Sequence, residues 1–326
     1  MGITITDLQS EYGSYYNAGS QNEARLRKQL YYGFETANFF MPVPTDSTRY
    51  EMAKDDMSRV AQGFQTTWSP TGDITVEAVP IDTYRIKADV ELTPDTIEES
   101  WLGFLASNDT DRKEWPLIRW LIENHILARF NHDLERNEIF HGQYSAASGG
   151  TPSAAGEAMT GFRKLINDAY AAEIPSANKI ATGAIETDPT DFVDQIEAFC
   201  ASMPELIKMQ PLVKLAFRGS LKSRWLQGMR AKYNMNYSQF ADGEIMRVAD
   251  HPNVQVMPLH SFQSSEKIVA SVATNAVMPV KDMQNVGNFQ IESVDRTIKI
   301  FDDVRFGVGF TRWDQVCTND RDLSNS

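Results

Sequence analysis

Cysteine is scarce in this sequence. The 326 residues include only two, Cys200 and Cys317, and their wide separation matches neither a metal-binding nor a redox motif. Cys200 falls on the apolar side of a predicted helix, so we expect a reduced thiol in the core rather than a disulfide. The cysteine content therefore excludes a disulfide-rich scaffold and a zinc-finger site.

Positive charge and long apolar runs are also in short supply. The 31 Lys and Arg are outnumbered by 44 Asp and Glu, for a formal net charge of -13. Binding to nucleic-acid phosphates rests on clusters of Lys and Arg, and no basic run is present. No stretch approaches the roughly 20 apolar residues that span a bilayer, and the first thirty residues contain no signal-peptide core. We therefore predict neither non-specific nucleic-acid binding nor a membrane segment.

Catalytic motifs are missing as well. There is no Gly-x-Ser-x-Gly elbow, and although Gly156 and Gly161 have the spacing of a phosphate-binding loop, Phe162 stands where that loop needs Lys. Glu138 and His141 form one Glu-x-x-His pair, whereas a carboxylate-bridged metal site needs a second. We interpret this pair as a solvated helix end. The sequence thus predicts no catalytic, cofactor-binding or metal-binding residues and no cofactor.

The most strongly patterned stretch covers residues 111 to 142. Its apolar residues recur at every fourth position: Ile118, Ile122, Ile126, Phe130 and Leu134. This spacing predicts one helix with a continuous apolar face. No Pro or Gly interrupts it after Pro116 and before Gly142, so the helix would measure roughly 39 Å at about 1.5 Å per residue. A helix of that length can span a whole domain.

Before this helix the apolar period changes to two. Alternation over residues 74–78 and 84–92 predicts half-buried strands. Together with the preceding segment, residues 49–92 are expected to form an extended two-stranded arm. Such an arm is marginal alone in water and needs a neighbour to rest on.

Strand patterns return near the C-terminus. They cover residues 289–293, 297–301 and 304–311, whereas residues 166–284 alternate helix and strand patterns, which suits an α/β unit. We therefore expect one domain assembled from both ends of the chain, with the long helix across its sheet. Residues 1–48 are expected to be an arm that packs on something else.

This order of elements resembles the major capsid protein of tailed double-stranded DNA bacteriophages, the Hong Kong 97-like fold. The residues that carry the resemblance are Asp73-Ile74-Thr75-Val76 in the hairpin, Thr93-Pro94 before a short helix, Leu134 to Gly142 closing the long helix, Gly161-Phe162, Asp302 to Val308, Trp313 and Val316. It implies an α+β fold with the following parts: an N-terminal arm (1–48), an extended (E) loop hairpin (49–92), a peripheral (P) domain (93–165) with a spine helix (111–142) and β-sheet, an α/β axial (A) domain (166–284), C-terminal P-domain strands (285–318) and a polar tail (319–326).

The resemblance also implies a function. It predicts a non-enzymatic subunit that assembles with itself into hexamers and pentamers of an icosahedral virion capsid, built in the host cytoplasm around packaged double-stranded DNA without sequence-specific binding. Some relatives carry a large N-terminal scaffolding region. Because only residues 1–48 precede the hairpin here, we expect a separate scaffolding protein and a portal as partners, with decoration proteins left open. An encapsulin-like compartment and a soluble α/β enzyme remain alternatives.

Ten residues are candidates for contacts between subunits. Four are apolar and lie where the sequence offers no self-contained core: Phe39, Phe40, Met41 and Trp68. Six are charged and assigned to the hairpin: Arg49, Glu51, Lys54, Asp55, Arg85 and Lys87. An exposed ion pair contributes about 1 kcal/mol or less, but an icosahedral shell repeats each pair many times.

Overall fold

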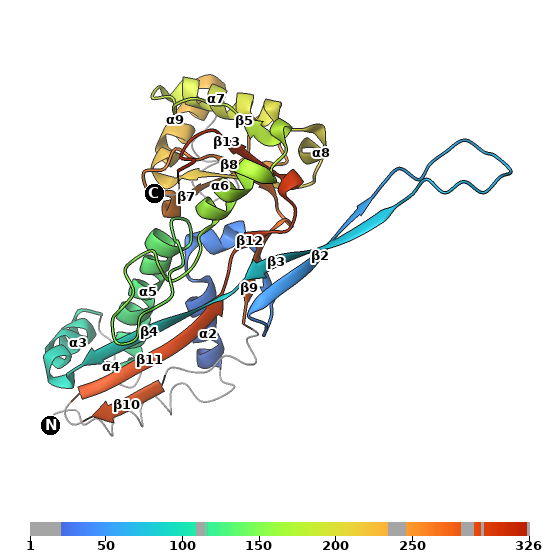
Figure 1. The fold of residues 1–326 in the computed structure, drawn as a ribbon. Coiled ribbons are helices and arrows are strands. Elements are labelled where there is room, and N and C mark those ends of the chain that lie inside the picture. The colour runs from blue at the N-terminus through green and yellow to red at the C-terminus, as the bar shows by residue number, and fades with distance from the viewer. Residues whose placement is uncertain are drawn as a thin grey trace.

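Two sheets, each with its own core, and one projecting hairpin make up the fold (Figure 1). The computed structural model describes residues 21–108, 115, 117–233, 246–281, 290–294 and 297–324. The helices are α2 (Gln21–Tyr32), α3 (Pro94–Asn108), α4 (Leu117–Trp120), α5 (Leu127–Asp133), α6 (Phe162–Ala172), α7 (Pro189–Ser202), α8 (Glu205–Lys208) and α9 (Lys222–Tyr233). This mixture of helix and sheet confirms the predicted α+β class.

The first sheet joins strands that are far apart in the sequence. It contains β1 (Met41–Pro44), β4 (Tyr84–Leu92), β9 (Ala276–Val280), β10 (Gln290–Val294), β11 (Thr297–Phe306) and β12 (Gly309–Phe310). The long strand β11 pairs antiparallel with β4 on one side and with β10 on the other. Strands from before the long helix and from the C-terminal part thus share one sheet, as predicted, although β11 runs unbroken through the expected gap after residue 301.

The long helix is continuous from Leu117 to Glu138 and packs in the same core as this sheet. Two π segments, Leu121–Ile126 and Leu134–Glu138, interrupt its α turns. An α-helix repeats every 3.6 residues, so side chains spaced by four drift around its surface, and the wider π turns rotate them back. Four of the five patterned residues are therefore buried: Ile118, Ile122, Ile126 and Leu134.

The helix boundaries differ from the predicted 111–142. The helix ends at Glu138 and a turn follows, in which Gly142 donates its backbone N–H to the Glu138 carbonyl oxygen at 2.9 Å. At the other end, residues 111–114 and 116 lie outside the described residues.

Residues 21–44 fold back onto the chain itself. Leu26 and Leu30 of α2 are buried in the first core, and β1 runs parallel to β9. Phe39 and Phe40 are also buried, and the Phe39 ring stacks on that of Phe162 with 6.0 Å between centroids. This corrects two predictions: the segment is not an arm that packs elsewhere, and these two rings are core residues rather than subunit contacts. Their partners come from distant segments, which local sequence does not reveal.

Two buried glutamates hold the long helix to its surroundings. Glu135 accepts hydrogen bonds from the Thr36 backbone N–H at 3.0 Å and from its hydroxyl, which ties the N-terminal segment to the helix. Glu138 accepts from the backbone N–H groups of Gly156 at 2.8 Å and Ala158 at 2.9 Å. Burial raises the pKa of both carboxyls. The interpretation of Glu138 as part of a solvated helix end is therefore wrong, because it anchors the loop that follows.

The second sheet has the order β5-β13-β8-β6-β7, with α7 and α9 packed together beside it. Its strands are β5 (Lys179–Ile180), β6 (Val213–Arg218), β7 (Val254–Leu259), β8 (Val269–Val272) and β13 (Val316–Asn319). β13 pairs with β8 and β5, although the sequence grouped it with the first sheet. Conversely, β9 leaves the predicted α/β region for the first sheet. A strand pattern does not specify which sheet edge the strand joins.

The fully buried Lys267 connects α6 to the C-terminal segment. Its ammonium group donates to the Asn167 side-chain oxygen at 2.8 Å and to the Arg321 carbonyl oxygen at 3.1 Å. Desolvation lowers the pKa of Lys267 to about 8, while the nearby carboxylates of Asp322 and Asp320 act in the opposite direction. Protonation of Lys267 is therefore coupled to the contact between α6 and the C-terminal segment.

We expect Glu138→Ala to lower the free energy of unfolding by at least about 2 kcal/mol, because it leaves two backbone N–H groups without their acceptor. Urea unfolding of the purified protein measures this change. The exposed Glu205→Ala is the matched control and is expected to change stability far less. Equal effects of the two substitutions would contradict the anchoring role.

We expect stability to rise with pH between about 8 and 10.5, because folded Lys267 loses its proton before the unfolded chain does. Lys267→Met removes this titration and should reduce the rise, whereas the exposed Lys222→Met should retain it. Denaturant unfolding over a pH series tests this, and an unchanged rise in Lys267→Met would refute it.

Candidate functional site

The projecting hairpin consists of β2 (Arg49–Met57) and β3 (Ile74–Asp82). The two strands pair antiparallel along their whole length and, among the described residues, join no other sheet. Figure 1 shows them extending well away from the body of the molecule. An isolated two-stranded ribbon is marginal in water, so this hairpin is the part of the chain that most needs a partner.

The outer part of the hairpin exposes large apolar side chains: Met57, Val60, Phe64, Trp68, Ile74 and Val76. Phe64 is 97% exposed and Trp68 is 90% exposed. The loop they occupy is nevertheless closed, because the Ser58 hydroxyl accepts from the Asp73 backbone N–H at 2.7 Å. Exposed apolar patches of this kind mark interaction surfaces.

The charged residues of the hairpin form cross-strand pairs within the chain. Arg49 lies 3.2 Å from the Asp82 carboxylate and Lys54 lies 3.9 Å from that of Glu77. Glu51 and Asp55 are exposed on the same strand. Among the apolar candidates, Trp68 and Met41 are exposed. Subunit contacts by these six residues stay predictions.

Arg85 and Lys87 do not belong to the hairpin, which corrects the predicted range 49–92. They lie on β4 in the first sheet, where Arg85 pairs with Asp303 and Lys87 with Asp89. The chain passes from β3 to β4 at Thr83, whose backbone N–H donates to the Thr48 carbonyl oxygen at 2.9 Å. The hairpin therefore ends at Asp82, the last residue of β3, and the chain continues directly into β4 of the first sheet.

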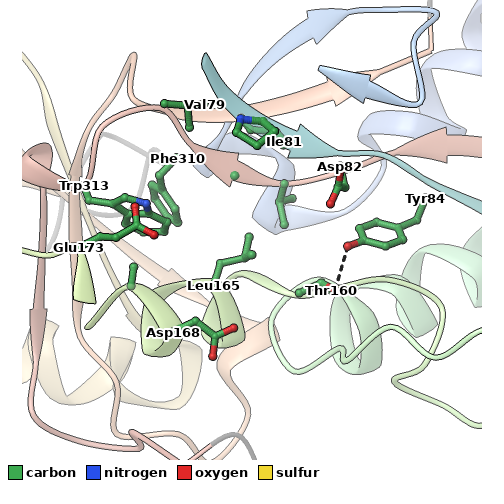
Figure 2. Close-up of a pocket in the computed structure, with 14 residues that line it drawn as sticks. Val79, Ile81, Asp82, Tyr84, Thr160, Leu165, Asp168, Glu173, Phe310 and Trp313 are labelled. Carbon is green, nitrogen blue, oxygen red and sulfur yellow. Dashed lines mark hydrogen bonds between the residues drawn. The ribbon is translucent and has the colours of Figure 1, made fainter. Parts of the chain in front are cut away.

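Close packing fixes the base of the hairpin. A Cβ atom on Gly307 would lie 2.1 Å from the Asp82 carbonyl oxygen, so no larger residue fits there without a shift. Beside this point is a groove of about 260 Å³ between β3, α6 and β12 (Figure 2). The Tyr84 hydroxyl donates to the Thr160 hydroxyl at 2.9 Å, and Figure 2 shows this hydrogen bond at one end of the groove.

The groove lining combines apolar side chains with three carboxylates. Ile81, Phe310 and Trp313 line it together with Asp82, Asp168 and Glu173. Asp168 is paired with Lys164 at 2.9 Å, and no His, Cys or Lys lines the groove. This mixture of apolar side chains and carboxylates is suited to contact with another surface.

The described residues form neither a metal-ligand cluster nor a disulfide. No group of three or more potential ligands for a metal ion occurs among them. Cys200 and Cys317 are free and buried, as predicted for Cys200, and burial raises the pKa of each thiol to about 12. No described helix combines the length and apolar character needed to cross a membrane.

Sequence reasoning found the hairpin but missed the groove and the buried polar residues. The groove is built from three segments separated by many residues, so no local pattern marks it. Lys267 and Glu135 were missed because charged residues are normally exposed. The one available signal was that Glu138 continues the every-fourth spacing that runs from Ile118 to Leu134.

Comparison with known proteins identifies the fold. No family model matches the sequence, and no curated protein matches it. A chain in the satellite phage P4 procapsid structure, which includes the size determination (Sid) protein, is similar with a TM-score of 0.56 and 11% identity over 97% of each chain. A capsid chain of Myoviridae phage XM1 is similar with a TM-score of 0.50 and 12% identity over 86% of this chain and 89% of that one.

The SrpI encapsulin of Synechococcus elongatus is less similar, with a TM-score of 0.49 and 12% identity over 86% of this chain and 84% of the other. The two phage structures show that this chain has the fold of phage capsid proteins, which confirms the resemblance seen in the sequence.

We expect Arg49→Gln and Lys54→Gln to change the free energy of unfolding of the unassembled chain by less than about 1 kcal/mol, because both ion pairs lie at the surface. Urea titration of dilute protein measures this. A larger loss would mean that the hairpin pairs stabilise the subunit itself rather than serve contacts outside it.

Proposed function

We propose that this chain is a major capsid protein that assembles into hexamers and pentamers of an icosahedral phage head around double-stranded DNA. The observation that carries the proposal is the capsid-protein fold over 97% of the chain. The projecting apolar hairpin, which lacks a core of its own, supports it. The similar chains come from structures of a phage procapsid and a phage capsid, which favours a non-enzymatic role.

The parts of the fold suggest a division of labour. We assign the hairpin, residues 49–82, to the extended loop, the first sheet with the long helix to the peripheral domain, and the second sheet with α7 and α9 to the axial domain. The two sheet domains would form the body of each capsomer. The hairpin would lie over a neighbouring subunit.

Burial of the hairpin tip supplies the driving force in this proposal. Apolar surface removed from water contributes about 25 cal/mol per Å², and Phe64 and Trp68 are almost fully exposed in the single chain. The exposed ion pairs add little individually, but a closed shell repeats every contact. The hairpin would therefore complete its packing only in the assembly.

The excess of acidic over basic residues suits a shell that encloses DNA. Each chain carries a net charge of -13, so the interior wall of the shell would repel the packaged polyanion. DNA would therefore stay free to move during packaging. We also propose a separate scaffolding protein and a portal as partners, assembly in the host cytoplasm, and a final location in the virion capsid.

We expect Phe64→Ala combined with Trp68→Ala to abolish or strongly reduce particle formation while leaving the circular dichroism of the unassembled chain unchanged, because both side chains lie outside its cores. Co-expression with the scaffolding protein, followed by electron microscopy and sedimentation, measures assembly. Gly63→Ala is the matched control, since a Cβ there meets nothing within 4 Å in the chain. Normal particles from the double variant would contradict the role of the tip.

The same particles distinguish the alternatives that the sequence leaves open. Nuclease-protected DNA inside tail-bearing particles supports a phage head, whereas particles filled with enzyme cargo indicate an encapsulin-like compartment. A soluble enzyme predicts a monomer or small oligomer on size-exclusion chromatography under conditions where a shell subunit gives capsomers or larger particles.

A further inference from the structure

The groove at the base of the hairpin carries a net negative charge. Its volume is about 260 Å³, and three carboxylates but no Lys, Arg or His line it. Asp82 lies 3.2 Å from the Arg49 side chain, and Asp168 lies 2.9 Å from the Lys164 ammonium group. In the described part of the chain, no Lys or Arg pairs with the third carboxylate, that of Glu173. The groove therefore offers one uncompensated acid beside apolar side chains.

Glu173 also has an unfavourable position within its own subunit. It is exposed and is the C-cap residue of α6. The C-terminus of a helix carries a partial negative charge, which repels an acidic side chain and attracts a basic one. Figure 2 shows Glu173 and Trp313 toward one end of the groove and Asp82 toward the other. A cation that entered at the Trp313 end would relieve this repulsion.

The tip of the hairpin has the opposite character. Residues 58–72 contain a single charged residue, Arg59, and the exposed rings of Phe64 and Trp68. The Arg59 Nε atom donates to the Ala61 carbonyl oxygen at 2.9 Å, and no carboxylate of the described residues pairs with its guanidinium group. The tip is thus a basic, aromatic segment in a chain whose net charge is -13.

Hydrogen bonds across the loop hold the tip as a continuation of the ribbon. The Gln62 side-chain amide, for example, donates to the Ser69 carbonyl oxygen at 2.6 Å. Trp68 and Asp82 lie 14 residues apart in the sequence, which at about 3.3 Å per residue places Trp68 roughly 45 Å from the groove. Trp68 therefore cannot reach the groove of its own chain while the strands stay paired. A tip that occupies this groove has to come from another copy.

We propose that the groove at the base of the hairpin receives the hairpin tip of a second copy of this chain. The groove has room for one large aromatic side chain, and Trp68 of the partner subunit fills it against Trp313. Arg59 of the partner subunit pairs with Glu173, so each compensates the charge that the other subunit leaves unpaired. This contact rests on the proposed capsid function and identifies the surface that accepts the hairpin.

The contact joins two different surfaces, so it is heterologous. Each copy donates one tip and accepts another, which arranges the copies head to tail and closes them into a ring where the rotation between neighbours allows. The distance between neighbouring grooves in such a ring equals the reach of the hairpin, roughly 45 Å. The hexamers and pentamers of the proposed function are rings of this kind, whereas a two-fold dimer that pairs two tips is not.

Charge exchange in the full chain tests the pairing. We expect Glu173→Arg to weaken self-association by about tenfold or more, because like charges then face each other across the contact. Arg59→Glu should weaken it to the same extent, and the two substitutions together should restore most of the wild-type association. Sedimentation velocity over a concentration series measures each change. The circular dichroism of every variant should match the wild type, because both residues are exposed.

Glu205→Arg is the matched control for the charge exchange. Glu205 is exposed on α8 and does not line the groove, so its substitution should leave self-association unchanged. It should also fail to rescue Arg59→Glu. Rescue by Glu205→Arg would show a general effect of net charge and would overturn the pairing with Glu173.

Cross-linking tests whether the contact lies between copies. Thr67→Cys places a thiol beside Trp68 and Ala172→Cys places one beside Glu173; both positions are exposed, whereas the two native cysteines are buried. The two single variants are mixed, assembled and oxidised with diamide. We expect a disulfide-linked dimer on denaturing electrophoresis that neither variant gives alone.

The outcomes separate this contact from the proposed function. Wild-type association of Glu173→Arg, or assembled mixtures without the cross-link, would overturn the contact and leave the capsid function standing. A wild-type chain that forms nothing larger than a dimer at any concentration would remove the proposed function and the contact with it.

Discussion

The burial of one apolar face along the whole length of the long helix is the constraint on which the structure depends. Residues spaced by four keep that face toward the core only because two π segments correct the drift of the α turns. The face packs against the first sheet and the N-terminal segment together. Glu135 and Glu138 then fix its end by hydrogen bonds to segments that local sequence does not connect.

Residues 21–44 and the hairpin differ in where their apolar side chains lie. Residues 21–44 satisfy their apolar side chains internally, with Phe39 and Phe40 in the core. The hairpin of β2 and β3 leaves Phe64 and Trp68 in solvent and shares no ladder with another described strand. This contrast locates the unsatisfied surface of the subunit in the hairpin, and it is the physical basis for proposing that assembly completes its packing.

Much of the architecture could be predicted because periodicity reflects burial. The every-fourth pattern from Ile118 to Leu134 predicted the helix, and alternation predicted the strands before and after it. The hairpin range was wrong at Arg85 and Lys87 because β3 continues into β4 with the same alternation, and only pairing with β11 separates them. For the same reason β13 could not be assigned to the second sheet from its pattern.

By itself, the sequence determined the fold class, the long helix, the existence of an extended hairpin and the order of elements that resembles capsid proteins. These follow from local spacing and turn residues. Only the tertiary structure decided that the N-terminal segment packs inward, that Lys267 is buried, and that Ile81, Glu173 and Trp313 line one groove. Such placements depend on contacts between residues far apart in the chain, whose partners no local pattern specifies.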